Sequence, residues 1–164
     1  MKKILVCLLA VCALVCTSCK KNPAEKYVGN YNVTLSGTMS ANVLNQDLSQ
    51  PITQEGAFVV ELDGDEGDVV ISGLYNTHGH VSEDGVLTLD PQKFETSYPV
   101  NIPILGEFNL PVSLDLTFTP ISEPGNTLNW VTKATGVNTF SIPAIGEVTA
   151  TFDGTGTNTA VKVE

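Results

Sequence analysis

Apolar and polar residues alternate with a period of two along most of the chain, which is the pattern of β-strands whose two faces meet different surroundings. The clearest case is NLPVSLDLTFT, in which one face holds Leu110, Val112, Leu114, Leu116 and Phe118. Similar alternation, rich in Val, Ile, Thr and Phe, predicts further strands at residues 31–39, 57–62, 68–75, 85–89, 94–100, 128–135, 137–142, 147–154 and 159–163. We read no convincing amphipathic helix beyond the N-terminal segment, so the chain is expected to be all-β.

Turn-forming residues separate these segments, as at Asp63-Gly64, Asp84-Gly85 and Asp153-Gly154. About eight to ten short strands joined by tight turns predict an antiparallel up-and-down barrel of about eight or more strands. A β-sandwich is the alternative, because the periodicity of single strands does not reveal their order in a sheet. Residues 41–56 have weak periodicity, and we predict a long loop there.

A weak internal repeat relates Ile102-Pro103-Ile104-Leu105-Gly106-Glu107 to Ile142-Pro143-Ala144-Ile145-Gly146-Glu147. Proline cannot donate a hydrogen bond to a strand ladder and is confined to edges, strand starts and bulges. Each copy is therefore predicted to be a hairpin connection whose glycine takes a positive φ. Two equivalent loops beside one opening are the functional alternative to two similar turns.

The first residues form an export signal. Lys2 and Lys3 precede an apolar run from Ile4 to Val15, which is too short to span a bilayer as a helix of about 20 residues. The segment Thr17-Ser18-Cys19 resembles the lipobox of bacterial lipoprotein signal peptides, although Cys16 stands where that pattern favours Leu. The resemblance implies lipidation, including palmitate, at Cys19. The alternative is an ordinary cleaved signal with an incidental cysteine.

These features predict three segments: residues 1–18 as the signal peptide, 19–26 as the lipidated N-terminus and tether, and 27–164 as one β domain. The expected location is the cell envelope, lipid-anchored and most consistent with the outer membrane, on its periplasmic or its surface face. All four cysteines lie in the first 19 residues. The predicted mature domain therefore contains neither a disulfide nor a cysteine nucleophile.

The charge balance limits the partners. The chain has 18 acidic residues against 8 lysines and no arginine, and its net charge is −10. Removal of Lys2 and Lys3 with the signal changes this to −12, because every acidic residue lies beyond it. Nucleic acid binding requires clustered Lys or Arg and is not expected. The membrane is expected as a partner only through the lipid anchor at Cys19; a protein partner is not identified by the sequence.

The start of the domain, Tyr27-Val28-Gly29-Asn30-Tyr31, resembles the Gly-x-Trp motif on the first barrel strand of lipocalins and the wider calycin group. With the lipobox, tether and meandering strands, the whole pattern is similar to lipocalin-like lipoproteins of Bacteroidetes. The resemblance implies that Tyr31 plugs a closed barrel end. Lipocalins also place a basic residue over this aromatic, for which Lys162 is the only late candidate here. Their C-terminal helix has no counterpart in this sequence.

A barrel of about eight strands is wide enough to be filled by side chains or to hold one small ligand. We therefore predict a small apolar ligand, for which the candidate lining residues are Tyr31, Leu35, Phe118, Trp130, Phe140 and Phe152. In a filled barrel the same residues form the core instead.

A second candidate site lies in YNTHGHVSEDG. His78 and His80 are two residues apart, so in an extended segment both point to one side and are candidate metal ligands, with Glu83 or Asp84 as a third. An ordinary hairpin loop explains the same residues.

The chain contains neither a Gly-x-Ser-x-Gly elbow nor a phosphate-binding Gly-rich loop before a helix. We therefore expect no catalytic residues, no enzyme activity and no cofactor. The predicted function is non-catalytic binding of a small, apolar ligand by an envelope lipoprotein. The alternative is a β-sandwich module that contacts another envelope protein or a glycan.

Overall fold

The structure is a computed structural model, and it describes residues 21–64, 66–102, 106–122, 124–142 and 145–163. The predicted signal peptide and Cys19 lie outside the described residues. The elements in chain order are η1 (Pro23–Lys26), β1 (Gly29–Val43), β2 (Gln46–Leu62), β3 (Asp68–Gly73), β4 (Thr77–Val81), β5 (Leu87–Leu89), β6 (Gln92–Ile102), β7 (Gly106–Phe118), β8 (Thr127–Ile142) and β9 (Gly146–Val163).

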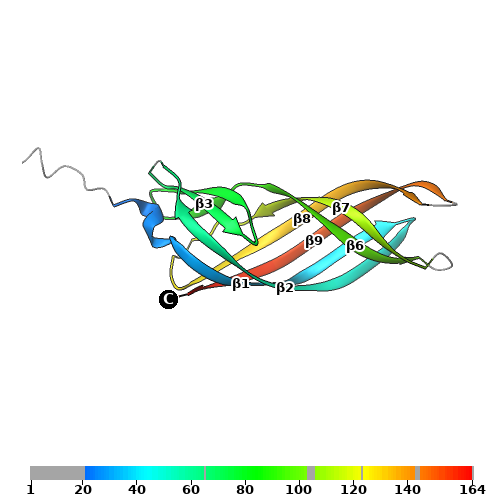
Figure 1. The fold of residues 1–164 in the computed structure, drawn as a ribbon, viewed down its shortest axis with the longest axis horizontal. Coiled ribbons are helices and arrows are strands. Elements are labelled where there is room, and N and C mark those ends of the chain that lie inside the picture. Colours follow the sequence, from blue (N-terminus) through cyan, green and yellow to red (C-terminus); the bar gives the residue numbers. More distant parts are fainter. Residues whose placement is uncertain (1–20, 65, 103–105, 123, 143–144, 164) are drawn as a thin grey trace, which may run out of the picture.

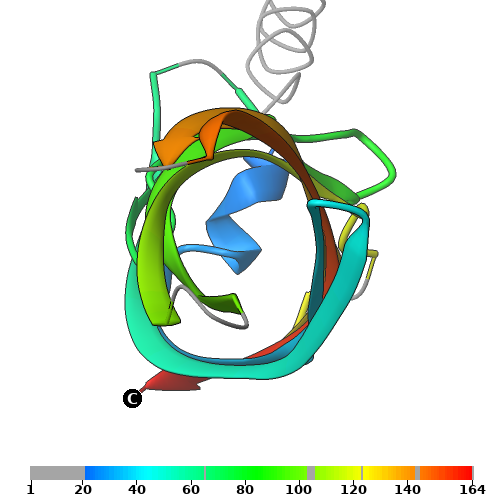
Figure 2. The ribbon, with the colours of Figure 1, turned by 90° about the vertical axis from the view of Figure 1, so that its right-hand side faces the viewer.

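The nine strands form one antiparallel sheet with the neighbour order β5-β4-β3-β2-β1-β9-β8-β7-β6. Two meanders, β1 to β5 and β6 to β9, are joined where β1 pairs with β9. The sheet curls into a half-barrel, so the predicted all-β antiparallel fold is confirmed (Figures 1 and 2). The described strands, the helix and both cores lie within residues 22–163.

The half-barrel has one closed end, where η1 lies (Figure 1). Here β5 meets the segment after β7, and the backbones of Leu87 and Ile121 exchange two hydrogen bonds of 2.9 and 2.8 Å. The Tyr27 hydroxyl lies 2.7 Å from the Gly85 carbonyl oxygen and 3.1 Å from that of Ile121, and it donates to this pair of acceptors. Ala24 of η1 is fully buried, so the final residues of the predicted tether are packed against the barrel.

Several predicted strand boundaries were wrong. Residues 128–135 and 137–142 are one strand, β8, and residues 147–154 and 159–163 are one strand, β9. We predicted that the strands end near Gly136 and Gly156, but the pairing of β8 with β9 continues through both glycines without interruption. A Cβ atom at Gly136 would lie 2.6 Å from the carbonyl oxygen of Ser113. The glycine therefore permits close approach of backbones and does not mark a turn.

The predicted loop at residues 41–56 was also wrong. The segment is a hairpin in which β1 continues to Val43 and β2 starts at Gln46, with Leu44 and Asn45 at φ 53° and 61°. Two consecutive residues of positive φ make a tight two-residue turn that matches the twist of the strands. The alternation of β2 is weak in the sequence because its inward positions before Phe58 are at most half-buried and include Gln50 and Gln54.

The two copies of the internal repeat are both hairpin connections, as predicted. One lies between Ile102 of β6 and Gly106 of β7, and the other between Ile142 of β8 and Gly146 of β9. The glycines have φ of 91° and 99°. The paired ends of β6 and β7 and those of β8 and β9 lie at the end of the barrel opposite η1 (Figure 1).

Candidate functional site

A cavity of about 420 Å³ lies inside the half-barrel, between a core at the closed end and a second core at the far end. Its apolar lining comes from five strands and the β3–β4 connection: Leu35, Met39, Ile52, Leu74, Tyr75, Phe94, Tyr98, Leu114, Leu116 and Ala134. Among the described residues that line it, none carries a charge, and the polar ones are Thr, Ser, Gln and the Tyr hydroxyls. The arrangement is that of a small-molecule pocket with an apolar body and few polar groups.

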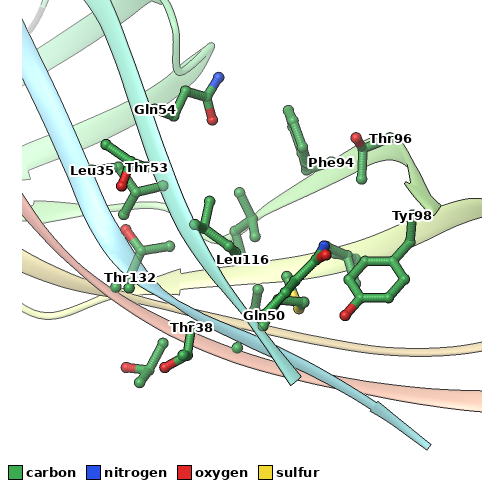
Figure 3. Close-up of a pocket in the computed structure, with 18 of the residues that line it drawn as sticks. Leu35, Thr38, Gln50, Thr53, Gln54, Phe94, Thr96, Tyr98, Leu116 and Thr132 are labelled. Carbon is green, nitrogen blue, oxygen red and sulfur yellow. The ribbon is translucent and has the colours of Figure 1, made fainter. Parts of the chain in front are cut away.

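The wall of the barrel is incomplete beside this cavity. Of β2, only Phe58–Leu62 pairs with β3, and within the described residues β6 pairs with β7 alone. In the part of the chain that the structure describes, no strand pairs with the outer edges of Gln46–Gly56 and Gln92–Ile102. Figure 3 shows Gln50 and Gln54 on β2 across from Phe94 and Thr96 on β6. The cavity therefore has a lateral entrance with a polar rim.

The back of the cavity is formed by glycines. Gly37 of β1 pairs with Gly156 of β9, and Gly154 lies two residues away on the same inward face. A Cβ atom at Gly37 would lie 2.2 Å from the carbonyl oxygen of Thr155. The glycine at position 37 therefore permits close approach of β1 and β9. Cβ atoms at Gly154 and Gly156 would lie 2.9 Å from Met39 Sδ and 2.4 Å from Leu35 Cδ1, two side chains that line the cavity, so glycine leaves room for them.

A group of three buried polar side chains lies on the closed-end side of the cavity. The Tyr75 hydroxyl donates to Asn158 Oδ1 at 2.6 Å, and Asn158 Nδ2 donates to Thr132 Oγ1 at 2.8 Å. Asn158 is fully buried in the core, whereas Tyr75 and Thr132 also line the cavity. Burial raises the pKa of the Tyr75 phenol, and the hydrogen bond with the Thr132 hydroxyl opposes part of this rise. The phenol is therefore a neutral donor at physiological pH.

The six predicted ligand-binding residues fall in different places. Leu35 lines the cavity, whereas Tyr31 and Trp130 lie in the core of the closed end and Phe140 and Phe152 in the core of the far end. Phe118 is partly buried and packs against both cores. The roles of these residues in binding remain a prediction, and the geometry favours a core position for five of them.

Trp130 packs edge-on against Phe58 and Tyr75, with ring centroids 6.0 and 6.1 Å away. Its indole Nε1 is buried and has no hydrogen-bond partner among the described residues. Through Tyr75, the single tryptophan of the chain is one side chain away from the cavity.

Tyr31 and Lys162 lie next to each other at the closed end. Tyr31 is fully buried at the closed end, and its ring stacks on Phe58 with centroids 5.2 Å apart. Lys162 pairs with Tyr31 across β1 and β9 and places Nζ 5.9 Å from the centre of the tyrosine ring. A Cβ atom at Gly29 would lie 2.5 Å from Lys162 Cε, so glycine leaves room for this side chain. Membership of the lipocalin family stays a prediction.

His78 and His80 lie on the exposed face of β4, as the spacing predicted. Each pairs with its own carboxylate: His78 Nδ1 lies 3.0 Å from Asp63 Oδ2, and His80 Nδ1 lies 2.6 Å from Asp68 Oδ1. Across the described residues, His, Cys, Asp and Glu side chains do not gather in threes at a distance suited to a metal ion. The geometry therefore supports two surface histidine–carboxylate contacts better than a metal site.

No protein-family model matches the chain, and no curated protein matches its sequence. Within the described residues, no helix has the length and apolar character needed to cross a membrane.

Residues of the pocket that the sequence analysis missed include Thr132, Gln50, Gln54, Phe94 and Tyr98, and it also missed the supporting Asn158. One signal was available in the chain. The inward face of β9 changes from Phe152 to Gly154 and Gly156, and a run of small residues on a barrel interior indicates unfilled space. The sequence of β6 contains no such signal, because β6 lies across the cavity from β2 only as a result of the curl of the sheet.

Proposed function

We propose that the protein is a cell-envelope lipoprotein, anchored through Cys19, whose half-barrel binds a small apolar molecule without chemical conversion. The observation that carries the proposal is the cavity of about 420 Å³ with an apolar lining and a lateral entrance between β2 and β6. Ligand pockets of proteins are typically apolar concavities of roughly 300–1,000 Å³ with a few placed polar groups. The size and lining of this cavity fit that description.

Binding is tested with N-phenyl-1-naphthylamine, a neutral dye whose fluorescence rises in apolar surroundings, added to the purified domain of residues 22–164. We expect saturable binding and a change in Trp130 emission. Ala134→Leu, which extends a side chain of the cavity wall, should abolish most of the signal. Thr157→Leu is the matched control because Thr157 is an exposed residue on the neighbouring strand β9. Equal binding by wild type and Ala134→Leu would contradict the proposal.

The lipid anchor is tested in cells with an alkyne analogue of palmitate. We expect the full chain to incorporate the label and to sediment with membranes, because two or more acyl chains give stable membrane attachment. Cys19→Ala should lose the label, whereas Cys16→Ala should keep it. Labelling of Cys19→Ala at the wild-type level would disprove this part of the proposal.

The alternative function is a module that binds a segment of another protein by strand addition. The two unpaired edges beside the cavity favour it, since an exposed edge is a template for an added strand. However, β2 carries Pro51 and β6 carries Pro99, and a proline removes one donor from an edge. Because prolines at edges oppose strand addition, we favour the small-molecule function.

A further inference from the structure

The chemistry of the cavity limits its ligand to a narrower class, an inference that rests on the proposed function. The polar side chains on the described lining are all uncharged, and the whole chain has a net charge of −10. An ionised carboxylate or ammonium group would lose its hydration in this cavity without gaining a partner of opposite charge. The negative charge of the protein also repels anions. The buried part of the ligand is therefore neutral.

The buried group of Tyr75, Asn158 and Thr132 offers hydrogen bonds at one end of the cavity. Asn158 uses Oδ1 to accept from Tyr75 and Nδ2 to donate to Thr132 at 2.8 Å and to the Trp130 carbonyl oxygen at 3.4 Å. Thr132 is 6% exposed and accepts from Asn158, so its own proton remains for a further acceptor. The phenol oxygen of Tyr75 is one such acceptor inside the protein, and a ligand oxygen in the cavity is another.

The same group also supplies acceptors. The Tyr75 hydroxyl donates one hydrogen bond, to Asn158, and its oxygen retains lone pairs that accept either from the Thr132 hydroxyl or from a ligand hydroxyl. Tyr75 is one of the residues that line the cavity. A ligand hydroxyl can therefore both accept from Thr132 and donate to Tyr75, and a ligand carbonyl can accept from Thr132. A purely apolar ligand would leave these groups without a partner from the ligand.

We infer that the cavity selects neutral, mostly apolar molecules that carry a hydroxyl or carbonyl group at the end that enters it, and that Thr132 and Tyr75 bind this group. Asn158 positions both side chains and does not contact the ligand. The long-chain alcohols are the simplest members of this class, and the corresponding fatty acids, ionised at neutral pH, are excluded from it.

The test compares 1-decanol with decanoate as competitors of N-phenyl-1-naphthylamine on the domain of residues 22–164 at pH 8. The two competitors share a chain length and differ in charge. We expect 1-decanol to displace the dye at a concentration at least about tenfold lower than decanoate, because a buried unpaired charge is costly. Equal displacement by the two competitors would overturn the inference and leave the proposed binding function intact. Failure of the dye to bind at all would instead contradict the proposed function.

The role of the polar group is tested with Thr132→Val, which keeps the branched shape and removes the hydroxyl. We expect the affinity for 1-decanol to fall about fivefold to tenfold, as for the loss of one hydrogen bond, and the affinity for the dye to stay within about twofold. Thr96→Val is the matched control, since Thr96 lines the entrance and makes no contact with the polar group. An equal loss of both affinities in Thr132→Val would show a merely structural role.

If circular dichroism shows that Thr132→Val is unfolded, Tyr75→Phe is used in its place. It keeps the ring and removes the hydroxyl, so the same selective loss of 1-decanol affinity is expected. If the preference for 1-decanol over the dye is unchanged in a folded Tyr75→Phe or Thr132→Val variant, the polar group does not recognise the ligand.

Discussion

The two ends of the half-barrel have the same architecture of antiparallel strands, but they differ in how the sheet closes. At the closed end, β3 to β5 extend the sheet until Leu87 pairs with Ile121, and η1 covers the interior. Towards the far end, β2 and β6 face each other, and no strand of the described residues pairs with these two edges (Figure 3). The closed end encloses fully buried aromatic side chains, including Tyr27 and Tyr31. The comparison shows that three short strands decide where the wall of the barrel closes.

The difference in interior residues follows the same division. In the closed end, Phe58 touches Tyr31 and Trp130 in an aromatic cluster. Between the two cores the inward positions are taken by Gly37, Gly154 and Gly156. Large side chains at both ends and glycines in the middle give two packed cores with the cavity between them.

The largest predicted difference is in the free energy of unfolding lost when a phenylalanine of the closed end or one of the entrance is replaced by alanine. Phe58→Ala should lower the free energy of unfolding by about 3–5 kcal/mol, because it removes a buried ring from a packed cluster. Phe94 is half-buried at the entrance. Phe94→Ala should lower the free energy of unfolding by about half as much or less, since less buried apolar area is lost. Urea unfolding followed by Trp130 fluorescence measures both values. Equal losses would mean that the entrance is packed like the closed end.

Glycine substitutions should separate close backbone approach from open space. We expect Gly37→Ala to lower the free energy of unfolding by about 1–3 kcal/mol, because its Cβ would lie 2.2 Å from the Thr155 carbonyl oxygen. Gly125→Ala is the matched control, since the nearest atom to its Cβ would be 4.0 Å away. Thermal unfolding measured by circular dichroism gives the comparison. A stable Gly37→Ala variant would show that the middle of the sheet relaxes.

Alkaline pH should weaken the closed end more than the far end. Burial raises the pKa of all four tyrosines, and Tyr27, Tyr31 and Tyr75 belong to the closed end, whereas Tyr98 belongs to the far end. A group with a raised folded pKa stabilises the fold below its unfolded pKa of about 10, and this stabilisation is lost as the pH rises above that value. The Tm should therefore fall above about pH 10.

The contribution of each end is separated by variants. Tyr75→Phe should reduce the alkaline fall in Tm, because one closed-end phenol no longer titrates, and Tyr98→Phe should reduce it less. Each Tm is compared with that of the same variant at pH 7. A Tm that stays constant to pH 11 in the wild type would contradict the prediction.

The smallest difference between the two regions is expected in the protection of backbone amides from hydrogen exchange. The amides of β1 lie between β2 and β9 and should exchange slowly with deuterium, whereas outward amides of β2 from Gln46 to Gly56 and of β6 should exchange quickly. Hydrogen exchange followed by mass spectrometry measures the exchange of the β1 amides and of the edge amides of β2 and β6 in one experiment. Slow exchange along both edges would indicate that another chain covers the entrance.

Alternation along single strands predicted much of the fold, because burial on one face of a sheet is a local pattern with a period of two. The inward positions of β7, such as Leu114 and Leu116, were predicted correctly as one apolar face. The hairpins at Gly106 and Gly146 were predicted from proline and glycine alone. The hairpin at Leu44 and Asn45 was missed because these residues adopt a positive φ without a glycine to indicate it.

By itself, the sequence determined the strands, most of their turns and the direction of their apolar faces, because these depend on neighbouring residues along the chain. The tertiary structure decided where the apolar faces meet and where they leave space. The cavity joins Leu35, Phe94 and Thr132 from three separate strands, and Asn158 is buried only because the sheet curls around it. The curl and closure of the sheet arise from pairing between segments that are distant in the sequence, β1 with β9 and Leu87 with Ile121. The periodicity of a single strand does not indicate which segment it pairs with.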